Sequence, residues 1–234
     1  MDRPVALVTG GAHGIGAAIA AHLAHDGWHV VVADHDAHGA PPAGGRYVVC
    51  DVADETAVNA LLAGVAAQDE RLDALVCNAG INIRKPIAHL ALAEWSRVIG
   101  TNLTSTFLLA RAAQAMLRAA HGAVVTIAST RAHMSEADTE AYAASKGGLV
   151  ALTHALSISL APEVRVNCIS PGWIFTKGDL PRPEDHQFHP AARVGTPDDV
   201  AVLTAFLLDR RAGFITGAEF IVDGGVTRKM IYPE

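Results

Sequence analysis

A short apolar run leads directly into a glycine-rich loop and then into a helical pattern. Residues 5–9 predict a buried strand, residues 10–16 contain four glycines, and residues 17–25 predict a helix. By itself, the spacing Gly-x-x-x-Gly-x-Gly would also fit a flexible turn. Between a strand and a helix it predicts a dinucleotide site, because glycines let the backbone approach a pyrophosphate and the helix N-terminus offers free N–H groups. The cofactor contacts expected in this loop are Gly10, His13, Gly14, Ile15 and Gly16.

Strand-like and helix-like segments alternate along the rest of the chain. Further strands are expected at 28–33, 47–50, 72–77, 123–128, 164–169 and 220–222, and further helices at 55–67, 90–100, 103–119, 142–160 and 196–208. Such alternation predicts a Rossmann-type, doubly wound parallel sheet of about seven strands with helices on both faces. Without a linker or repeat, residues 1–234 are expected to form one domain. Residues 176–193 show no period and predict a mobile loop near the site.

Composition and charge narrow the classes of function. The net charge of −6 gives no reason to expect nucleic acid or an anionic membrane surface as a partner. No apolar run reaches the ~18 residues of a membrane span, and the first residues lack a signal sequence, so a cytoplasmic location is expected. The cysteines and histidines have no metal-ligand spacing, which predicts inert thiols and no metal site.

Polar residues follow several of the expected strands. Asp34 lies about 20 residues beyond the glycine loop, where a carboxylate can accept hydrogen bonds from an adenosine ribose and would repel a 2′-phosphate. No Arg or Lys in the loop or next to Asp34 reverses this effect, so NAD is favoured over NADP. The alternative is a solvated turn, because Asp36 is also close by. Asp51 could meet the adenine, and Asn78-Ala79-Gly80 would let cofactor and backbone pass closely.

Ser129, Tyr142 and Lys146 form the candidate for chemistry. On a helix, Tyr142 and Lys146 share one face, and a nearby ammonium favours the phenolate and lowers a phenol's pKa. A phenol tuned in this way can exchange a proton with an alcohol oxygen. Ser129 ends an apolar run, which predicts a place at the carboxyl end of a strand, where ligands bind in open α/β sheets. A Tyr and a Lys at this spacing also occur by chance. Asn102, between two expected helices, fits a structural or a catalytic role.

Taken together, these residues resemble the short-chain dehydrogenase/reductase family, in its compact NAD(P)-dependent branch, over nearly the whole chain. Thr9-Gly10-x-x-x-Gly14-x-Gly16 resembles the cofactor loop of that family, and Asn78-Ala79-Gly80 resembles its sheet-stabilising turn. Its catalytic tetrad is matched in order and spacing by Asn102, Ser129, Tyr142 and Lys146, and its nicotinamide contact by Pro171, Gly172 and Thr176.

The resemblance implies a role for each of these positions. Tyr142 would be the general acid/base, Lys146 would lower its pKa and hold the nicotinamide ribose, and Ser129 would bind the substrate oxygen. Asn102 would bind a water that relays protons from Lys146. For the cofactor, the resemblance implies Asp34 at the ribose, Asp51 and the Val52 backbone at the adenine, and Ile174 and Thr176 at the carboxamide. It also implies a homo-oligomer, a tetramer or dimer formed through the helices at 103–119 and 142–160.

The expected activity is NAD-dependent interconversion of a secondary alcohol and a ketone. A non-catalytic NAD(H)-sensing protein of the same fold is the alternative, and an isomerase or dehydratase with a recycled nicotinamide is a further rival. Cations near the expected site would suit a sugar, polyol or hydroxy acid, but acidic residues are interleaved with them, and a solvated surface is the competing interpretation. The cations are Arg84, Lys85, Arg131, His133, Arg182, His186 and His189. Residues 176–193 are short for the family's substrate-covering loop, so the pocket could be open or completed by a neighbouring subunit.

Overall fold

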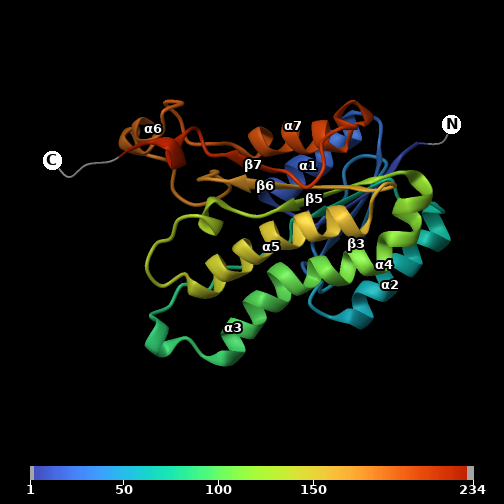
Figure 1. Cartoon of the computed structure of the whole chain (residues 1–234), viewed down its shortest axis with the longest axis horizontal. Coiled ribbons are helices and arrows are strands. Elements are labelled where there is room, and N and C mark those ends of the chain that lie inside the picture. The colour runs from blue at the N-terminus through green and yellow to red at the C-terminus, as the bar shows by residue number, and fades with distance from the viewer. Residues whose placement is uncertain (1–2, 231–234) are drawn as a thin grey trace.

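Seven parallel strands form a single sheet in the computed structural model, which describes residues 3–230 (Figure 1). Their order is β3-β2-β1-β4-β5-β6-β7, so the sheet grows outward in both directions from the β1–β4 pair. The strands are β1 Val5–Thr9, β2 His29–Asp34, β3 Arg46–Val49, β4 Ala74–Cys77, β5 Ala123–Ile127, β6 Arg165–Pro171 and β7 Glu219–Val222. The predicted fold class is confirmed, and each predicted strand lies within a few residues of its observed bounds.

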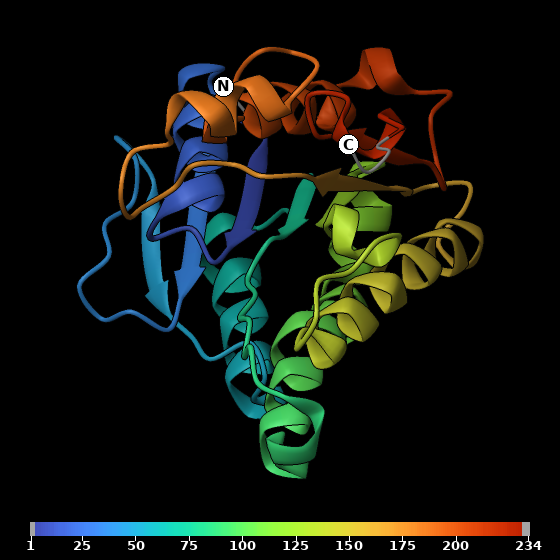
Figure 2. The same ribbon diagram turned by 90° about the vertical axis from the view of Figure 1, so that its left-hand side faces the viewer.

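Helices cover both faces of the sheet because the central strands are apolar on both sides (Figures 1 and 2). The helices are α1 Gly14–His25, α2 Glu55–Asp69, α3 Leu92–Ile99, α4 Ser105–Ala120, α5 Glu140–Ser159, α6 Pro183–Phe188 and α7 Pro197–Leu208. One face packs Val8 and Val32 against α1 and α7. The other packs Leu7 and Val31 against α2 and α4. Successive strand residues therefore belong to opposite layers, as the two-residue period of a strand requires.

Two segments differ from the sequence-based predictions. The predicted loop 176–193 contains the helix α6, in which Pro183 follows Arg182 and the Arg182 backbone N–H donates to Asp185 at 2.8 Å. These are helix-start signals of the kind that correctly predicted α7. The two helices predicted around Asn102 are joined by π-helical turns over Gly100–Thr104 rather than by a break. Within residues 3–230, no helix is both long and apolar enough to cross a membrane.

Candidate active site

A pocket of about 280 Å³ opens where the sheet order reverses, beyond the carboxyl ends of the strands. This reversal is where open α/β sheets bind ligands, because loops leaving neighbouring strands diverge to opposite faces there. The pocket is lined by residues that follow β1, β4, β5 and β6: Ile15, Asn78, Gly80, Ile81, Asn82, Ile127, Ala128, Ser129, Tyr142, Lys146, Pro171, Gly172, Ile174 and Thr176. Candidates separated by more than 100 positions in the sequence therefore share one cavity.

The glycine loop has the shape that a pyrophosphate site needs. A Cβ on Gly16 would lie 2.1 Å from the Gly10 carbonyl oxygen, and a Cβ on Gly14 would lie 3.2 Å from the Thr176 side chain. His13 is the N-cap of α1, yet its side chain makes no capping hydrogen bond. The first N–H groups of a helix that lacks a side-chain cap are available to an anion. The loop therefore fits a dinucleotide, with the phosphates at the start of α1.

Asn78 fastens the end of β4 to the end of β1. Its Nδ2 donates to the carbonyl oxygens of Thr9 at 3.0 Å and Gly10 at 2.9 Å, while its backbone N–H donates to the Thr9 hydroxyl at 3.1 Å. These bonds fix the first residues of the glycine loop against the neighbouring strand. Ala79 is equally close, because a Cβ on Gly10 would lie 2.7 Å from the Ala79 Cα.

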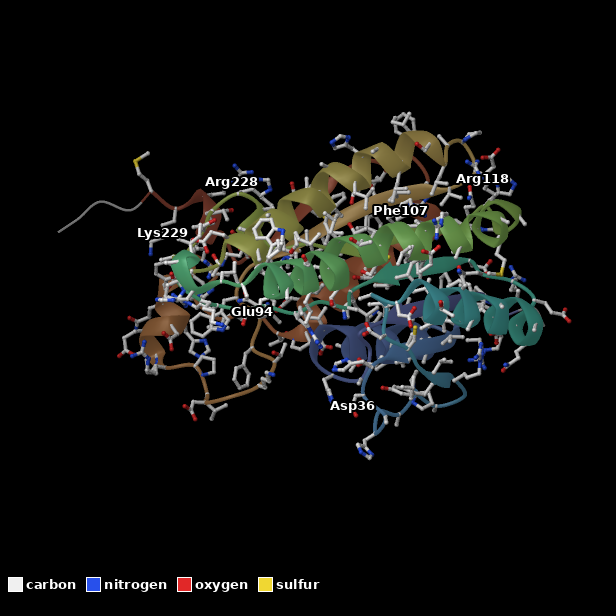
Figure 3. All side chains as sticks on the ribbon, turned by 90° about the horizontal axis from the view of Figure 1, so that it is seen from below. Asp36, Glu94, Phe107, Arg118, Arg228 and Lys229 are labelled. Atoms are coloured by element: carbon white, nitrogen blue, oxygen red, sulfur yellow. The ribbon has the colours of Figure 1, made fainter. Side chains whose placement is uncertain are left out.

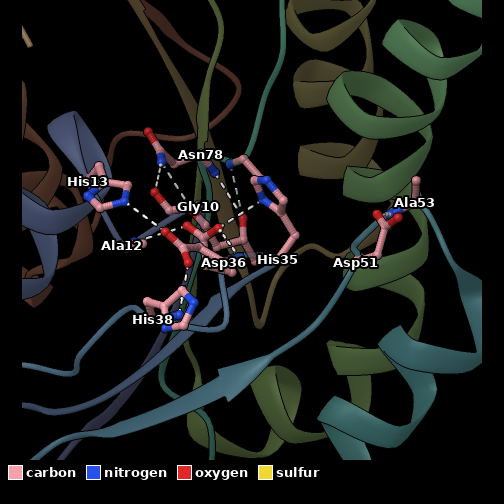
Figure 4. A network of polar contacts seen from close by, with 12 residues as sticks. Gly10, Ala12, His13, His35, Asp36, His38, Asp51, Ala53 and Asn78 are labelled. Atoms are coloured by element: carbon pink, nitrogen blue, oxygen red, sulfur yellow. Dashed lines mark hydrogen bonds and ion pairs between the residues drawn. The ribbon is translucent and has the colours of Figure 1, made fainter. Parts of the chain in front are cut away.

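Asp34 lies at the end of β2 beside the same loop. Figure 4 shows Asp36, two residues further on, beside His13 of that loop. One oxygen of the Asp34 carboxylate accepts from the Ala12 backbone N–H at 3.0 Å, and the other lies 3.0 Å from His35 Nδ1. The Asp36 N–H also donates to this carboxylate at 3.1 Å, so one of its about four lone-pair sites is left for a ribose hydroxyl. Asp51 is exposed and accepts from the Ala53 N–H at 3.0 Å. The side chain of Val52 is buried in the core. Neither Asp51 nor Val52 lines the pocket, and their predicted adenine contacts stay predictions.

Tyr142 and Lys146 lie one turn apart on α5 and reach the pocket beside Ser129. Lys146 is buried, and its Nζ donates to the Ile127 carbonyl oxygen at 2.8 Å and lies 5.5 Å from the centre of the Tyr142 ring. Ser129 follows β5, and its Oγ accepts from the Arg131 N–H at 3.2 Å. Ser129, Tyr142 and Lys146 thus line one side of the same pocket.

The predicted lowering of the Tyr142 pKa by Lys146 is wrong for the structure as it stands. Burial raises the pKa of the Tyr142 phenol, and hydrogen bonding with Ser129 and the charge of Arg131 oppose this only in part. Burial also lowers the pKa of Lys146 to about 8. Both changes have the same physical origin, because a desolvated site disfavours the charged form of either group.

Asn102 lies behind the pocket rather than in its wall. Its Oδ1 accepts from the Ile81 N–H at 2.8 Å, and its Nδ2 donates to the Ile81 carbonyl at 2.9 Å and to the Ser145 hydroxyl at 2.9 Å. The side chain is buried, and both its oxygen and its nitrogen form hydrogen bonds with other protein groups. Asn102 therefore ties the segment after Gly80 to α5, which supports the structural alternative, while the predicted water relay stays a prediction.

Replacing Asn102 by Ala should lower the free energy of unfolding by about 3 kcal/mol, because both backbone groups of Ile81 would lose their buried partner. Urea denaturation measures this change. Asn59→Ala, on the exposed face of α2, is the matched control and should change stability by less than about 0.5 kcal/mol. Equal small effects of both substitutions would contradict the proposed structural tie.

The cations that were predicted near the site do not line the pocket, and most of them contact acidic groups. Arg84 and Arg131 both contact Glu136, at 3.1 and 2.5 Å, and Lys85 lies 2.6 Å from Glu94. His133 lies 2.7 Å from Glu219, and Arg182 lies 2.9 Å from Asp185. His189 is buried and contacts the Asp185 carbonyl, and His186 accepts from the Val194 N–H. The predicted cationic mouth is therefore mostly a set of ion pairs, which is the competing interpretation that the interleaved acids indicated.

The chain just before and just after residues 176–193 is joined by backbone hydrogen bonds next to the pocket. The Phe175 N–H donates to the Gly195 carbonyl at 2.9 Å, and the Gly195 N–H donates to the Trp173 carbonyl at 3.1 Å. In Figure 2, α6 lies on one side of the sheet and α3 on the other. These bonds fix Ile174 in the pocket wall, and the Ala191 N–H donates to the Gly224 carbonyl at 3.0 Å, which holds the segment to the turn after β7.

Four wall residues were missed by the sequence analysis: Ile81, Asn82, Ile127 and Ala128. Each lies next to a predicted strand end that had already been assigned to the site. Their position next to these strand ends could therefore have predicted that they line the pocket, although their residue types do not indicate a catalytic role. Asn82 is the polar member of this group, and its side chain is exposed.

Known proteins resemble this chain over nearly its full length. A family model described as enoyl-(acyl carrier protein) reductase matches residues 10–227. An uncharacterized oxidoreductase of Thermotoga maritima is 46% identical, with 100% of both chains covered. A D-threitol dehydrogenase of Mycolicibacterium smegmatis is 38% identical over 98% of this chain and 95% of the relative. The solved structure of a Thermoplasma acidophilum aldohexose dehydrogenase in ligand-free form superposes with a TM-score of 0.93 at 30% identity, covering 99% of this chain and 98% of that one.

Proposed function

Because the chain belongs to the short-chain dehydrogenase/reductase family and to its NAD(P)-dependent dehydrogenases that act on CH–OH groups, we propose that it oxidises a neutral polyhydroxylated alcohol with NAD. The observation that carries the proposal is the shared pocket of Ser129, Tyr142 and Lys146, next to a glycine loop that fits a dinucleotide. Bound NAD would supply the redox chemistry by accepting a hydride from the alcohol carbon.

The protein's own residues would handle the proton and the orientation of the substrate. Ser129 would hydrogen-bond the alcohol oxygen, and the Tyr142 phenolate would take the hydroxyl proton. Lys146, whose Nζ lies 2.8 Å from the Ile127 carbonyl oxygen and 5.5 Å from the centre of the Tyr142 ring, would stabilise that phenolate when protonated. Ile174 and Thr176 would contact the carboxamide end of the cofactor, and Gly80 would leave room beside Lys146, since a Cβ there would lie 3.5 Å from Nζ.

This assignment predicts different pH profiles for oxidation and for reduction. The pKa of Tyr142 is raised, so the phenolate needed for oxidation becomes more abundant as pH rises, by about tenfold per unit below that pKa. We expect kcat/KM for oxidation to rise from about pH 6 to about pH 9, and kcat/KM for ketone reduction to stay flat until the phenol ionises. Steady-state rates in both directions measure this. An oxidation rate that is level across the whole range would contradict Tyr142 as the base.

Two observations support NAD as the cofactor. Asp34 lies at the end of β2 beside the glycine loop, where its charge would repel a 2′-phosphate. The described residues of that loop include no Arg or Lys. Titration with NADH and NADPH, followed by fluorescence, tests the preference. Tighter binding of NADPH would overturn it.

A neutral substrate is favoured over a hydroxy acid because the mouth cations are already paired with carboxylates. The D-threitol relative and the aldohexose dehydrogenase structure support the same class. Lys177, exposed next to Thr176, makes no ion pair among the described residues and is the alternative contact for an acid. Rates with four- to six-carbon polyols, sugars and matching hydroxy acids test this, with Lys177→Gln as the diagnostic variant. Faster oxidation of the acids, lost in that variant, would contradict a neutral substrate.

Assembly into a homo-oligomer through α4 and α5 is also proposed. Phe107 on α4, labelled in Figure 3, is 45% exposed, and Ile158 on α5 is 79% exposed. Large apolar side chains at this exposure suit a contact between subunits. Light scattering of the purified protein and of a Phe107→Glu variant tests it. A monomeric wild-type protein would refute the assembly.

A further inference from the structure

A mostly buried carboxylate outside the pocket contacts two segments that lead into the pocket walls. Glu219 begins β7, and its side chain is only 19% exposed. Its Oε1 accepts a hydrogen bond from the Ser170 hydroxyl at 2.5 Å and lies 2.7 Å from His133 Nε2, while its Oε2 lies 2.9 Å from the same nitrogen. Because a carboxylate only accepts hydrogen bonds, His133 Nε2 carries the proton of this contact.

On one side, Glu219 holds the strand end that leads into the expected nicotinamide wall. Glu219 pairs with Cys168 in the register of β6 and β7, so Ser170, two residues further along β6, faces the same side of the sheet. Ser170 is completely buried and directly precedes Pro171 and Gly172, which line the pocket. The bond between Ser170 and Glu219 is therefore one residue away from that wall.

On the other side, Glu219 holds the turn that begins at Ser129. The Ala132 N–H donates to the Ser129 carbonyl at 2.9 Å, and the His133 N–H donates to the Thr130 carbonyl at 3.0 Å. These bonds form a compact turn, with Ser129 at its start and His133 at its end. A displacement of His133 would therefore be transmitted to Ser129.

The other ion pairs of residues 129–142 are more exposed than the contact with Glu219. Glu136 contacts Arg84 and Arg131, and its own side chain is 53% exposed. Solvent screens such pairs, so they hold a segment less firmly than a mostly buried contact does. Glu219 is thus the carboxylate best placed to fix the turn after Ser129.

We propose that Glu219 is a positioning residue for the reaction, which fixes Ser129 relative to Pro171 and Gly172 by holding His133 and Ser170 together. The inference rests on the proposed function, in which Ser129 binds the alcohol oxygen. Glu219 acts through these residues, because it does not line the pocket itself. Misplacing a group that orients a substrate by about 1 Å can slow a reaction about 100-fold. Loss of Glu219 should therefore lower kcat much more than it weakens cofactor binding.

Steady-state alcohol oxidation and NADH titration test this role in two variants of Glu219. Glu219→Ala removes both contacts and should lower kcat about 10- to 100-fold, with NADH affinity within about threefold of wild type. Glu219→Gln keeps an oxygen for the Ser170 hydroxyl and an amide that can donate to His133 in its other tautomer, so kcat should stay within about threefold. His133→Ala should reproduce most of the loss, and combining it with Glu219→Ala should slow the enzyme no further.

Glu163→Ala is the matched control, because it also removes a carboxylate from an ion pair. Glu163 contacts Arg118 beyond the carboxyl end of α5, and neither residue lines the pocket. This variant should lose stability in urea without losing kcat. A comparable loss of kcat in Glu163→Ala would mean that turnover follows stability, and an equal loss in Glu219→Gln and Glu219→Ala would mean that the charge matters and not the contact. Either result would overturn the positioning role. If Glu219→Ala does not fold, His133→Ala decides the question, because its side chain is half-exposed.

Hydrogen exchange of residues 129–139, followed by mass spectrometry, reports the same contact without turnover. The amides of the turn after Ser129 should exchange at least about tenfold faster in Glu219→Ala and His133→Ala, because a hydrogen bond to a charged group is lost. Glu219→Gln and Glu163→Ala should exchange as wild type does. If the wild-type protein oxidises no alcohol, the proposed function fails, and exchange still decides whether Glu219 holds the turn. Wild-type exchange in Glu219→Ala would overturn the inference.

Discussion

Tyr142→Phe should reduce kcat by at least about 10³-fold while leaving NADH affinity within about threefold of wild type. The substitution removes the one atom that would exchange a proton with the substrate and keeps the ring that packs beside Lys146, whose Nζ lies 5.5 Å from the ring centre. Because Ser129 and the glycine loop are unchanged, binding of the cofactor should survive. Steady-state kinetics and NADH titration of the same preparation measure both quantities.

Tyr47→Phe is the matched control for Tyr142→Phe. Tyr47 donates its hydroxyl to the Asp36 carbonyl, outside the pocket, so its loss should cost no more than a few-fold in kcat. Normal turnover in Tyr142→Phe would refute the phenol as the acid/base. A loss of NADH binding equal to the loss of turnover would mean that Tyr142 serves the cofactor site and not the proton transfer.

Gly16→Ala should abolish cofactor binding, with an affinity loss of at least about 100-fold, the equivalent of about 2.7 kcal/mol. A Cβ at this position would lie 2.1 Å from the Gly10 carbonyl oxygen and 2.5 Å from Asn78 Nδ2. Both atoms are part of the bonds that hold the loop to β4, so the loop must move to admit the methyl group. Titration with NADH measures the loss, and circular dichroism establishes whether the fold persists.

Gly64→Ala separates this effect from the general effect of a helical glycine. A Cβ on Gly64, within α2, would meet only the end of the Gln68 side chain at 3.9 Å. That substitution should stabilise the protein by about 0.5–1 kcal/mol, since Gly lowers helix stability relative to Ala. Wild-type NADH affinity in Gly16→Ala would contradict the account of the loop.

Much of the fold and of the site could be predicted because the carboxyl ends of parallel strands lie at one edge of the sheet, where ligands bind. Once residues 5–9 and 123–128 were assigned as buried strands, Gly10 and Ser129 had to lie at the same edge. The helical spacing of Tyr142 and Lys146 then directed both side chains to that edge. No long-range contact had to be guessed, because the sheet topology brought these segments together.

What failed depended on partners that are distant in sequence. The pKa of Tyr142 was predicted from its helical neighbour, but burial beneath other segments raises it. A cationic mouth was one of two interpretations of these residues, and the structure favours the other, because Arg84 pairs with Glu136 and His133 with Glu219, far along the chain. By contrast, α6 was missed despite local signals, since its six residues are too few to show a helical period.

The most direct test of the central claim is the formation of NADH when the purified protein is mixed with NAD and a panel of four- to six-carbon polyols and sugars, with the ketone product measured in parallel. We predict that at least one neutral alcohol yields NADH and ketone in equal amounts, and that the Tyr142→Phe variant yields neither. Tight NADH binding without conversion of any alcohol in the panel would contradict the account and favour a protein that senses NAD(H) without chemistry.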